Sequence, residues 1–152
     1  MPQWLWAMPE IRLAVWGAGF NTVWEFAQSP LYTDHHNGLA YVLWTRLHCT
    51  AGDVMILVFS FWLVCILMRS RNWLRDKKPV AIGLFLVFGV AYTIFSEWLN
   101  VNIRNTWDYV PAMPTVLGIG FTPVLQWLTI PPLVLFIVGS VETIRYRALT
   151  LP

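Results

Sequence analysis

Long runs of apolar residues alternate along the chain with short polar segments. Four runs stand out, and we interpret them as helices over residues 13–30, 49–68, 80–97 and 115–141. About 20 apolar residues in a helix suffice to cross the hydrocarbon core of a bilayer. The pattern therefore predicts an all-α integral membrane protein, a four-transmembrane-helix bundle that forms a single domain over residues 1–152. A short interfacial segment with Trp4 and Trp6 is expected at the N-terminus.

The fourth run is the least regular of the four, because it is longer than a perpendicular crossing requires and contains Pro123 and the pair Pro131-Pro132. One interpretation is a single tilted and kinked span, since neighbouring helices can satisfy the carbonyl groups that proline leaves free. The other is a re-entrant first half with a cavity lined by Gly118, Gly120 and Gln126.

Composition and charge strengthen the membrane prediction and give it a direction. The chain is 57% hydrophobic and 12% charged, whereas soluble domains are roughly 25% charged. Of its ten Lys and Arg residues, only Arg46 and Arg104 fall in the connectors at 29–46 and 100–114. Because positively charged loops stay in the cytoplasm, both termini are predicted to be cytoplasmic, in a bacterial inner membrane. Within the first connector, Leu39–Trp44 is expected to form a separate short interfacial helix.

Polar residues interrupt the apolar runs at helical spacing. Asn21, Glu25 and Gln28 lie on one face of the first run, and Thr93, Glu97 and Asn100 lie on one face of the third. Asp53 follows one turn after the start of the second run, where a carboxylate costs on the order of 2.5–3.5 kcal/mol if it lies at the centre of a span. Such groups are expected to face protein or a water-filled cavity rather than lipid.

These polar positions fall at one depth, in the outer half of the predicted membrane domain. We therefore predict a polar pocket near the outer surface, in which Glu25, His48, Asp53 and Glu97 are the candidate catalytic groups. The candidate substrate-binding residues are Asn21, Gln28, Trp98, Asn100, Arg104, Trp107, Tyr109 and Gln126. The competing structural interpretation pairs Glu25 with Arg46 or Arg104 and leaves Glu97 hydrated at the interface.

The favoured functional hypothesis is acid–base chemistry on, or binding of, a lipid-like substrate of isoprenoid or sterol type. Carboxylates and a histidine in a low-dielectric pocket have shifted pKa values that suit general acid–base catalysis. A membrane isomerase or cyclase would use them beside aromatic rings that stabilise positive charge. Trp24, Trp98 and Trp107 are the rings considered for this role.

Two alternatives remain open at this point. A metal-binding membrane protein would draw its ligands from His35, His36, His48 and Cys49, although no known ligand spacing is present and no cofactor is assigned. A non-catalytic accessory subunit of a larger membrane complex would use the polar groups for pairing inside the bundle or with other membrane subunits. The net charge of +2 gives no reason to expect nucleic acid as a partner.

Overall fold

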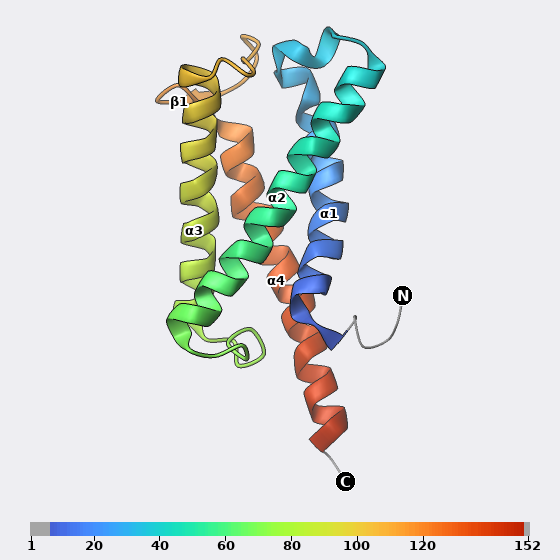
Figure 1. Cartoon of the computed structure of the whole chain (residues 1–152), viewed down its shortest axis with the longest axis vertical. Coiled ribbons are helices and arrows are strands. Elements are labelled where there is room, and N and C mark those ends of the chain that lie inside the picture. Colours follow the sequence, from blue (N-terminus) through green and yellow to red (C-terminus); the bar gives the residue numbers. More distant parts are fainter. Residues whose placement is uncertain (1–6, 151–152) are drawn as a thin grey trace.

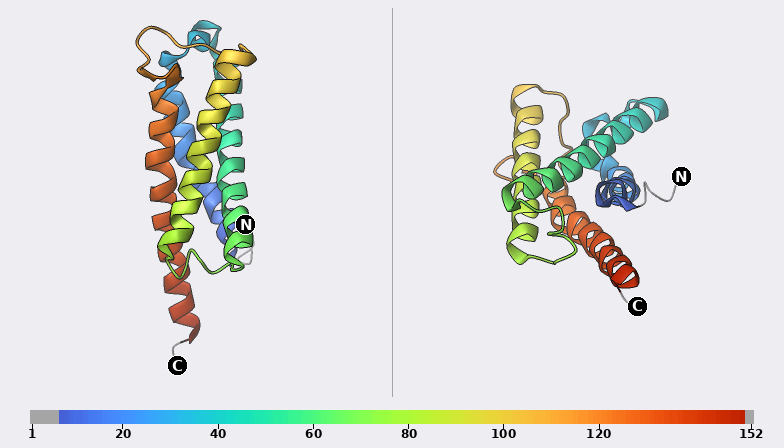
Figure 2. Two further views of the ribbon diagram at one scale, coloured as in Figure 1. Left: turned by 90° about the vertical axis from the view of Figure 1, so that its left-hand side faces the viewer. Right: turned by 60° about the horizontal axis from the view of Figure 1, so that its bottom comes forward.

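The described part of the chain folds into four α-helices that run alternately up and down (Figure 1 and Figure 2). The computed structural model describes residues 7–150, with side chains up to residue 144, so the predicted interfacial segment with Trp4 and Trp6 lies outside the described residues. The helices are α1 (Pro9–Gln28), α2 (Leu39–Met68), α3 (Pro79–Trp98) and α4 (Phe121–Thr150). The all-α prediction is confirmed.

Among the residues with described side chains, three helical stretches are long and apolar enough to cross a membrane: Leu39–Met68, Pro79–Ile103 and Phe121–Ile144. The α1 helix is as long as α3, with 20 residues each. Its buried face, however, carries charged and amide side chains, namely Glu10, Arg12, Asn21, Glu25 and Gln28. These groups lower the hydropathy of α1 and turn toward the other helices.

Three predicted helix boundaries are wrong, and one of them is the end of α4, which continues to Thr150 instead of ending at residue 141. The α2 helix is continuous from Leu39, after Gly38 in a backbone conformation with φ of 92°, so no separate helix covers Leu39–Trp44. The α4 helix begins only at Phe121. Before it, β1 (Thr115–Val116) and β2 (Ile119–Gly120) form a small antiparallel hairpin. The fourth run is thus one helix with Pro131 and Pro132 inside it, and the re-entrant alternative is not observed.

One end of the bundle, which we call the closed end, is the end where α1 begins, where α2 and α3 are joined by the 69–78 loop and toward which α4 runs (Figure 1). Trp73 from this loop is fully buried, and its ring packs against Phe61 and Phe85 at centroid distances of 5.6 and 5.9 Å. Glu10 pairs with Arg71 at 2.7 Å, and Arg12 pairs with Glu142. Packing and ion pairs therefore close this end.

At the opposite, open end, α2 leans away from α3 as it rises, as its diagonal course in Figure 1 shows. The two connectors at this end are joined to each other by backbone hydrogen bonds. Thr33 N–H donates to the Asp108 carbonyl at 3.0 Å, and Val110 N–H donates to the Leu31 carbonyl at 3.1 Å. We call these paired connectors the roof, which comprises residues 29–38 and 104–120.

A close approach between α3 and α4 is possible because residue 89 is glycine. Gly89 is buried on α3, and a Cβ atom there would overlap the six-membered ring of Trp127 on α4. Small residues at helix interfaces allow the backbones to approach closely. The indole of Trp127 thereby lies against the α3 backbone and is almost fully buried.

Candidate functional site

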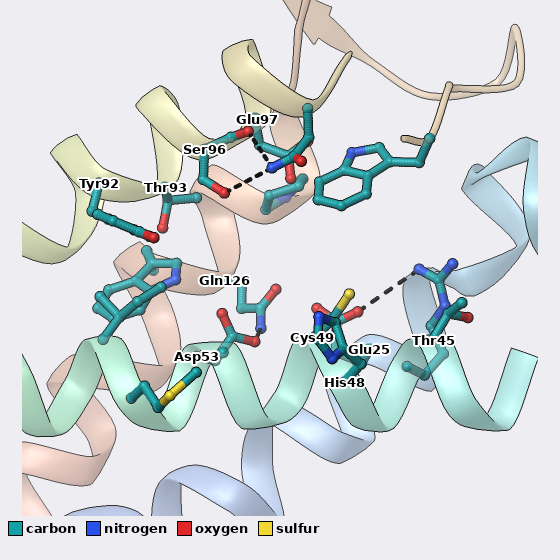
Figure 3. A pocket seen from close by; sticks show the side chains of 18 of the residues that line it. Glu25, Thr45, His48, Cys49, Asp53, Tyr92, Thr93, Ser96, Glu97 and Gln126 are labelled. Atoms are coloured by element: carbon teal, nitrogen blue, oxygen red, sulfur yellow. Dashed lines mark hydrogen bonds and ion pairs between the residues drawn. The ribbon is translucent and has the colours of Figure 1, made fainter. Parts of the chain in front are cut away.

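The divergence of α2 from α3 leaves a cleft of about 1110 Å³ between these helices, backed by α1 and α4 (Figure 3). Its polar lining contains carboxylate, amide, hydroxyl and guanidinium groups from every helix and from the roof. They include Glu25, Gln28, Asp34, Arg46, Asp53, Thr93, Ser96, Glu97, Asn100 and Gln126. The cleft is therefore a place where polar groups from distant parts of the sequence meet.

Gln126 connects the back wall of the cleft to the carboxylate on α2. Its side-chain amide nitrogen donates to Asp53 Oδ2 and to Asn21 Oδ1, both at 2.8 Å. Its oxygen accepts from Gln28 Nε2 at 3.3 Å, and Gln28 Nε2 also donates to Glu25 Oε1 at 2.8 Å. Figure 3 shows Asp53 and Gln126 side by side on α2 and α4. The network thus holds the carboxylates of Glu25 and Asp53 through hydrogen bonds from the neutral amides of Gln28 and Gln126.

Arg46 is the buried cation of the cleft, with 3% of its surface exposed. Its Nη2 contacts both carboxylate oxygens of Asp34 at 2.5 Å, and its Nη1 lies 3.8 Å from Glu25 Oε2. The guanidinium also lies 4.9 Å from the ring centroid of Tyr32. Arg46 is thus bound mainly by Asp34, and its contact with Glu25 is longer and involves only Nη1.

Glu97 reaches the cleft from the far end of α3, where the helix continues into a π-helical turn, η4 (Leu99–Ile103). Tyr109 from the roof donates its phenolic hydrogen to Glu97 Oε2, and its oxygen accepts from Gly120 N–H at 3.0 Å. Burial and the adjacent Glu97 carboxylate raise the pKa of Tyr109, so this phenol remains a donor at neutral pH. Single π-helical turns occur frequently at functional sites.

Thr93 lies one turn before Glu97 on the same face of α3. Its side chain is buried, with 7% of its surface exposed, and its hydroxyl has no hydrogen-bond partner in the structure. Figure 3 shows this hydroxyl pointing into the cleft. A buried hydroxyl usually has a partner, because leaving it unsatisfied costs roughly 1–3 kcal/mol. Thr93 is therefore placed to bind something that occupies the cleft.

The other half of the cleft is apolar and extends along α2 toward the closed end. Its walls are formed by Met55, Ile56, Phe59, Leu63, Ile66 and Phe88. Several of these side chains are also exposed at the surface of the protein, such as Phe59 at 71% and Ile66 at 69%. The mouth of the cleft thus opens sideways between α2 and α3, among exposed apolar residues.

A second cavity, of about 590 Å³, lies at the roof and is lined mainly by polar residues. It shares Asp34, Tyr41, Thr106 and Trp107 with the lining of the cleft. The polar half of the cleft is therefore adjacent to a polar cavity at the open end, whereas its apolar half opens sideways.

Of the residues selected from the sequence, the structure brings ten into the lining of the cleft. They are Glu25, Gln28, His48, Cys49, Asp53, Asn100, Arg104, Trp107, Gln126 and Glu97. His48 is exposed at the rim, where its ring stacks on Trp44. Asn21 and Tyr109 lie behind the lining and hold Gln126 and Glu97, respectively.

Other selected residues lie elsewhere. Trp98 is 45% exposed and packs against Phe95 on the outer surface of α3. Trp24 donates to Gln28 Oε1 at 3.1 Å and does not line the cleft. His35 and His36 lie in the roof, where His35 Nδ1 is 2.9 Å from Ser29 Oγ. Within residues 7–144, no three His, Cys, Asp or Glu side chains lie close enough together to hold a metal ion.

Several lining residues were not selected from the sequence, among them Thr45, Gly52, Tyr92, Ser96 and Trp127. Two of these could have been found from the sequence, because helical spacing places Ser96 and Tyr92 beside Glu97 and Thr93 on the same face of α3. Trp127 follows Gln126 in an apolar run and carries no such signal.

The chain matches no protein-family model, no curated protein and no solved structure.

Proposed function

We propose that the chain is an integral membrane protein with four spans, in which α1 joins the three apolar helices. Support comes from the many large apolar side chains exposed on the outside of α2, α3 and α4, which a bilayer would cover. The polar face of α1 is buried against the bundle. The concentration of Lys and Arg in the 69–78 loop supports a cytoplasmic location for the closed end and both termini, in a bacterial inner membrane.

Within that membrane, we propose that the cleft binds a lipid-like molecule of isoprenoid or sterol type. One observation carries the proposal: a single cleft has an apolar half that opens sideways and a polar half that holds carboxylates from three helices. An apolar molecule dissolved in the bilayer can enter through the side without crossing water. Its reactive or polar end then lies among Glu25, Asp53 and Glu97.

The chemistry that suits this arrangement is proton transfer. Asp53 and Glu97 are held by the neutral donors Gln126 and Tyr109, and neither carboxyl forms an ion pair with a Lys or Arg side chain among the described residues. A protonated carboxyl can add its proton to one carbon of a double bond, which leaves positive charge on the other carbon, and a carboxylate can remove a proton from the next carbon, the one bonded to that cationic centre. The double bond moves, the protons balance and no other reactant is needed. The rings of Trp107, Trp127 and Tyr92 line the same space and suit a developing positive charge.

The binding part of the proposal can be tested with a pair of glycine variants. Gly52 lines the cleft on α2, and a Cβ atom there meets no other atom within 4 Å, so Gly52→Phe fills the cleft without a clash at its Cβ. Gly83 on α3 offers the same open surroundings outside the cleft lining, so Gly83→Phe is the matched control.

After extraction in a mild detergent, mass spectrometry of the wild type and of Gly83→Phe is expected to show one enriched lipid-like molecule. Gly52→Phe is expected to lose it. Equal lipid profiles for all three proteins would contradict the proposal. A stoichiometric partner polypeptide with no retained small molecule would instead support the accessory-subunit hypothesis.

The catalytic part is tested separately with Asp53→Asn and Glu97→Gln, each of which removes an acid but keeps its shape. Both variants are expected to retain the molecule found in the wild type. If deuterium from heavy water exchanges into that molecule in the wild type, both variants are expected to slow the exchange by about 10²–10⁴-fold, the usual contribution of a general acid or base. Unchanged exchange in both variants would exclude these residues as the proton donors and acceptors.

A further inference from the structure

The lining of the cleft contains more acidic than basic side chains. Its lining holds the carboxylates of Glu25, Asp34, Asp53 and Glu97, but among the described lining residues the only Lys or Arg side chains are Arg46 and Arg104. Arg104 is exposed at the rim. Arg46 already contacts Asp34, Glu25 and the ring of Tyr32. An anionic head group would therefore meet carboxylates and find no buried cation free to bind it.

Aromatic rings surround the same polar half. Tyr92, Trp107 and Trp127 belong to the lining, in addition to Tyr32, whose ring Arg46 already contacts, and Trp44, which stacks on His48. The faces of such rings attract cations, most strongly when the cation is desolvated. The unpartnered hydroxyl of Thr93, one turn from Glu97, adds a neutral oxygen that can accept a hydrogen bond. Carboxylates, ring faces and an accepting hydroxyl together form a binding site for a positively charged group.

We infer that the cleft selects a hydrophobic amine, meaning a long apolar molecule whose polar end is an ammonium group, and that it rejects phosphate and sulfate head groups. This inference rests on the proposed binding function and names its ligand class. The ammonium lies between Asp53, Glu97 and Thr93. The chain lies along the apolar wall from Asp53 to Ile66, which is about 20 Å long at 1.5 Å per residue.

Three probes with the same ten-carbon chain separate the head-group chemistries: decyltrimethylammonium, decanol and decyl sulfate. The full-length protein is placed in lipid nanodiscs, and each probe is used below its micellar concentration. Cys49 is a free cysteine in the cleft lining, so an occupied cleft protects it from N-ethylmaleimide. Cys65 is also free but lies outside the lining. Mass spectrometry quantifies modification at each cysteine. Cys65 is buried and is expected to stay unmodified with every probe, so its modification would report unfolding rather than release of the cleft.

Decyltrimethylammonium is expected to protect Cys49 at a concentration about tenfold lower than decanol does, a difference of about 1.4 kcal/mol. Decyl sulfate is expected to protect least. The double variant with Asp53→Asn and Glu97→Gln should lose the preference for ammonium. Asp76→Asn, which removes one negative charge from the 69–78 loop outside the lining, should keep it.

The outcomes separate the two proposals. Equal protection by all three probes in the wild type, abolished in Gly52→Phe, would overturn the ammonium preference and leave lipid-like binding standing. Stronger protection by decyl sulfate would also overturn it. No protection by any probe, with Gly52→Phe indistinguishable from the wild type, would overturn the proposed binding function together with this inference.

Discussion

The acidic side chains of the closed end are held differently from Asp53 and Glu97 at the open end. At the closed end, Glu10 and Glu142 each contact an arginine from another part of the chain, and the side chain of Trp73 fills the remaining space. At the open end, Asp53 and Glu97 are held by neutral donors beside a cavity.

The difference indicates which carboxylates serve the scaffold. Buried ions are stable when they are paired and hydrogen-bonded, and a chain that needs only to hold helices together can achieve this, as the closed end does. Asp53 and Glu97 line the cleft near the unpartnered hydroxyl of Thr93. Each is held by a neutral donor, so neither carboxylate is needed to neutralise a buried arginine. The open end is therefore the part of the molecule to which we assign function.

Tryptophan replacement is expected to separate the two ends most strongly. Trp73→Ala removes a fully buried indole from between Phe61 and Phe85 and should lower the free energy of unfolding by about 3–5 kcal/mol. Trp107→Ala, which removes a half-buried ring from the roof, should cost less than about 1 kcal/mol. Denaturant titration in detergent measures both changes. Similar losses would contradict the contrast between a packed end and an open one.

Arg46 should be the residue at the open end on which folding depends most. Arg46→Gln leaves the buried carboxylate of Asp34, and beside it that of Glu25, without their cation, so we expect a loss of about 3 kcal/mol of stability. Arg75→Gln is the control, because its pair with Asp76 is partly exposed and should change stability by less than about 1 kcal/mol. The same titration measures both variants. An Arg46→Gln protein as stable as the control would show that the cleft tolerates unpaired carboxylates.

Removal of a single acid should have unequal effects at the two ends. Glu142→Gln takes away the carboxylate that Arg12 contacts and should cost about 2 kcal/mol, since the pair is only partly exposed. Asp53→Asn and Glu97→Gln keep an oxygen that accepts from Gln126 and Tyr109, so each should change stability by less than about 1 kcal/mol. Thermal unfolding of the three variants tests this order, which a large loss in either cleft variant would reverse.

The smallest perturbation is chemical labelling of the two native cysteines. Cys49 lines the cleft, which adjoins the polar cavity in the roof, whereas Cys65 is 6% exposed near the closed end. A membrane-impermeant maleimide added outside intact cells should therefore modify Cys49 and spare Cys65. Labelling of Cys49 only from the cytoplasmic side of inverted vesicles would reverse the proposed orientation.

The helical framework could be predicted because hydrophobic runs and helical spacing are local properties of a sequence. The spacing of Glu25 after Asn21, and of Glu97 after Thr93, placed these groups on shared faces. The start of α2 was missed because Arg46 and His48 interrupt its apolar pattern. The hairpin before α4 was missed because its turn depends on Leu117 and Gly118 at φ of 52° and 78°, which apolar content does not reveal.

The candidate site was only partly predictable, since its partners come from long-range contacts. Asp34, which binds Arg46, belongs to the connector between α1 and α2, and its distance of 12 residues from Arg46 gives no helical spacing that would predict the pair. Tyr109 reaches Glu97 only because backbone pairing of the two connectors brings it over the end of α3. Helical periodicity identifies which side chains share a face, but the cross-connections between faces depend on loop geometry.

Because residue 89 is glycine, it affects the size of the ligand that we propose for the cleft. Trp127 belongs to the wall of the cleft, and its indole rests in the hollow that Gly89 leaves on α3. Any larger residue at position 89 would clash with this ring and force it to move, which would change the shape of the cleft. Residue 89 does not line the cleft, but its size can therefore limit how bulky a molecule the cleft accommodates.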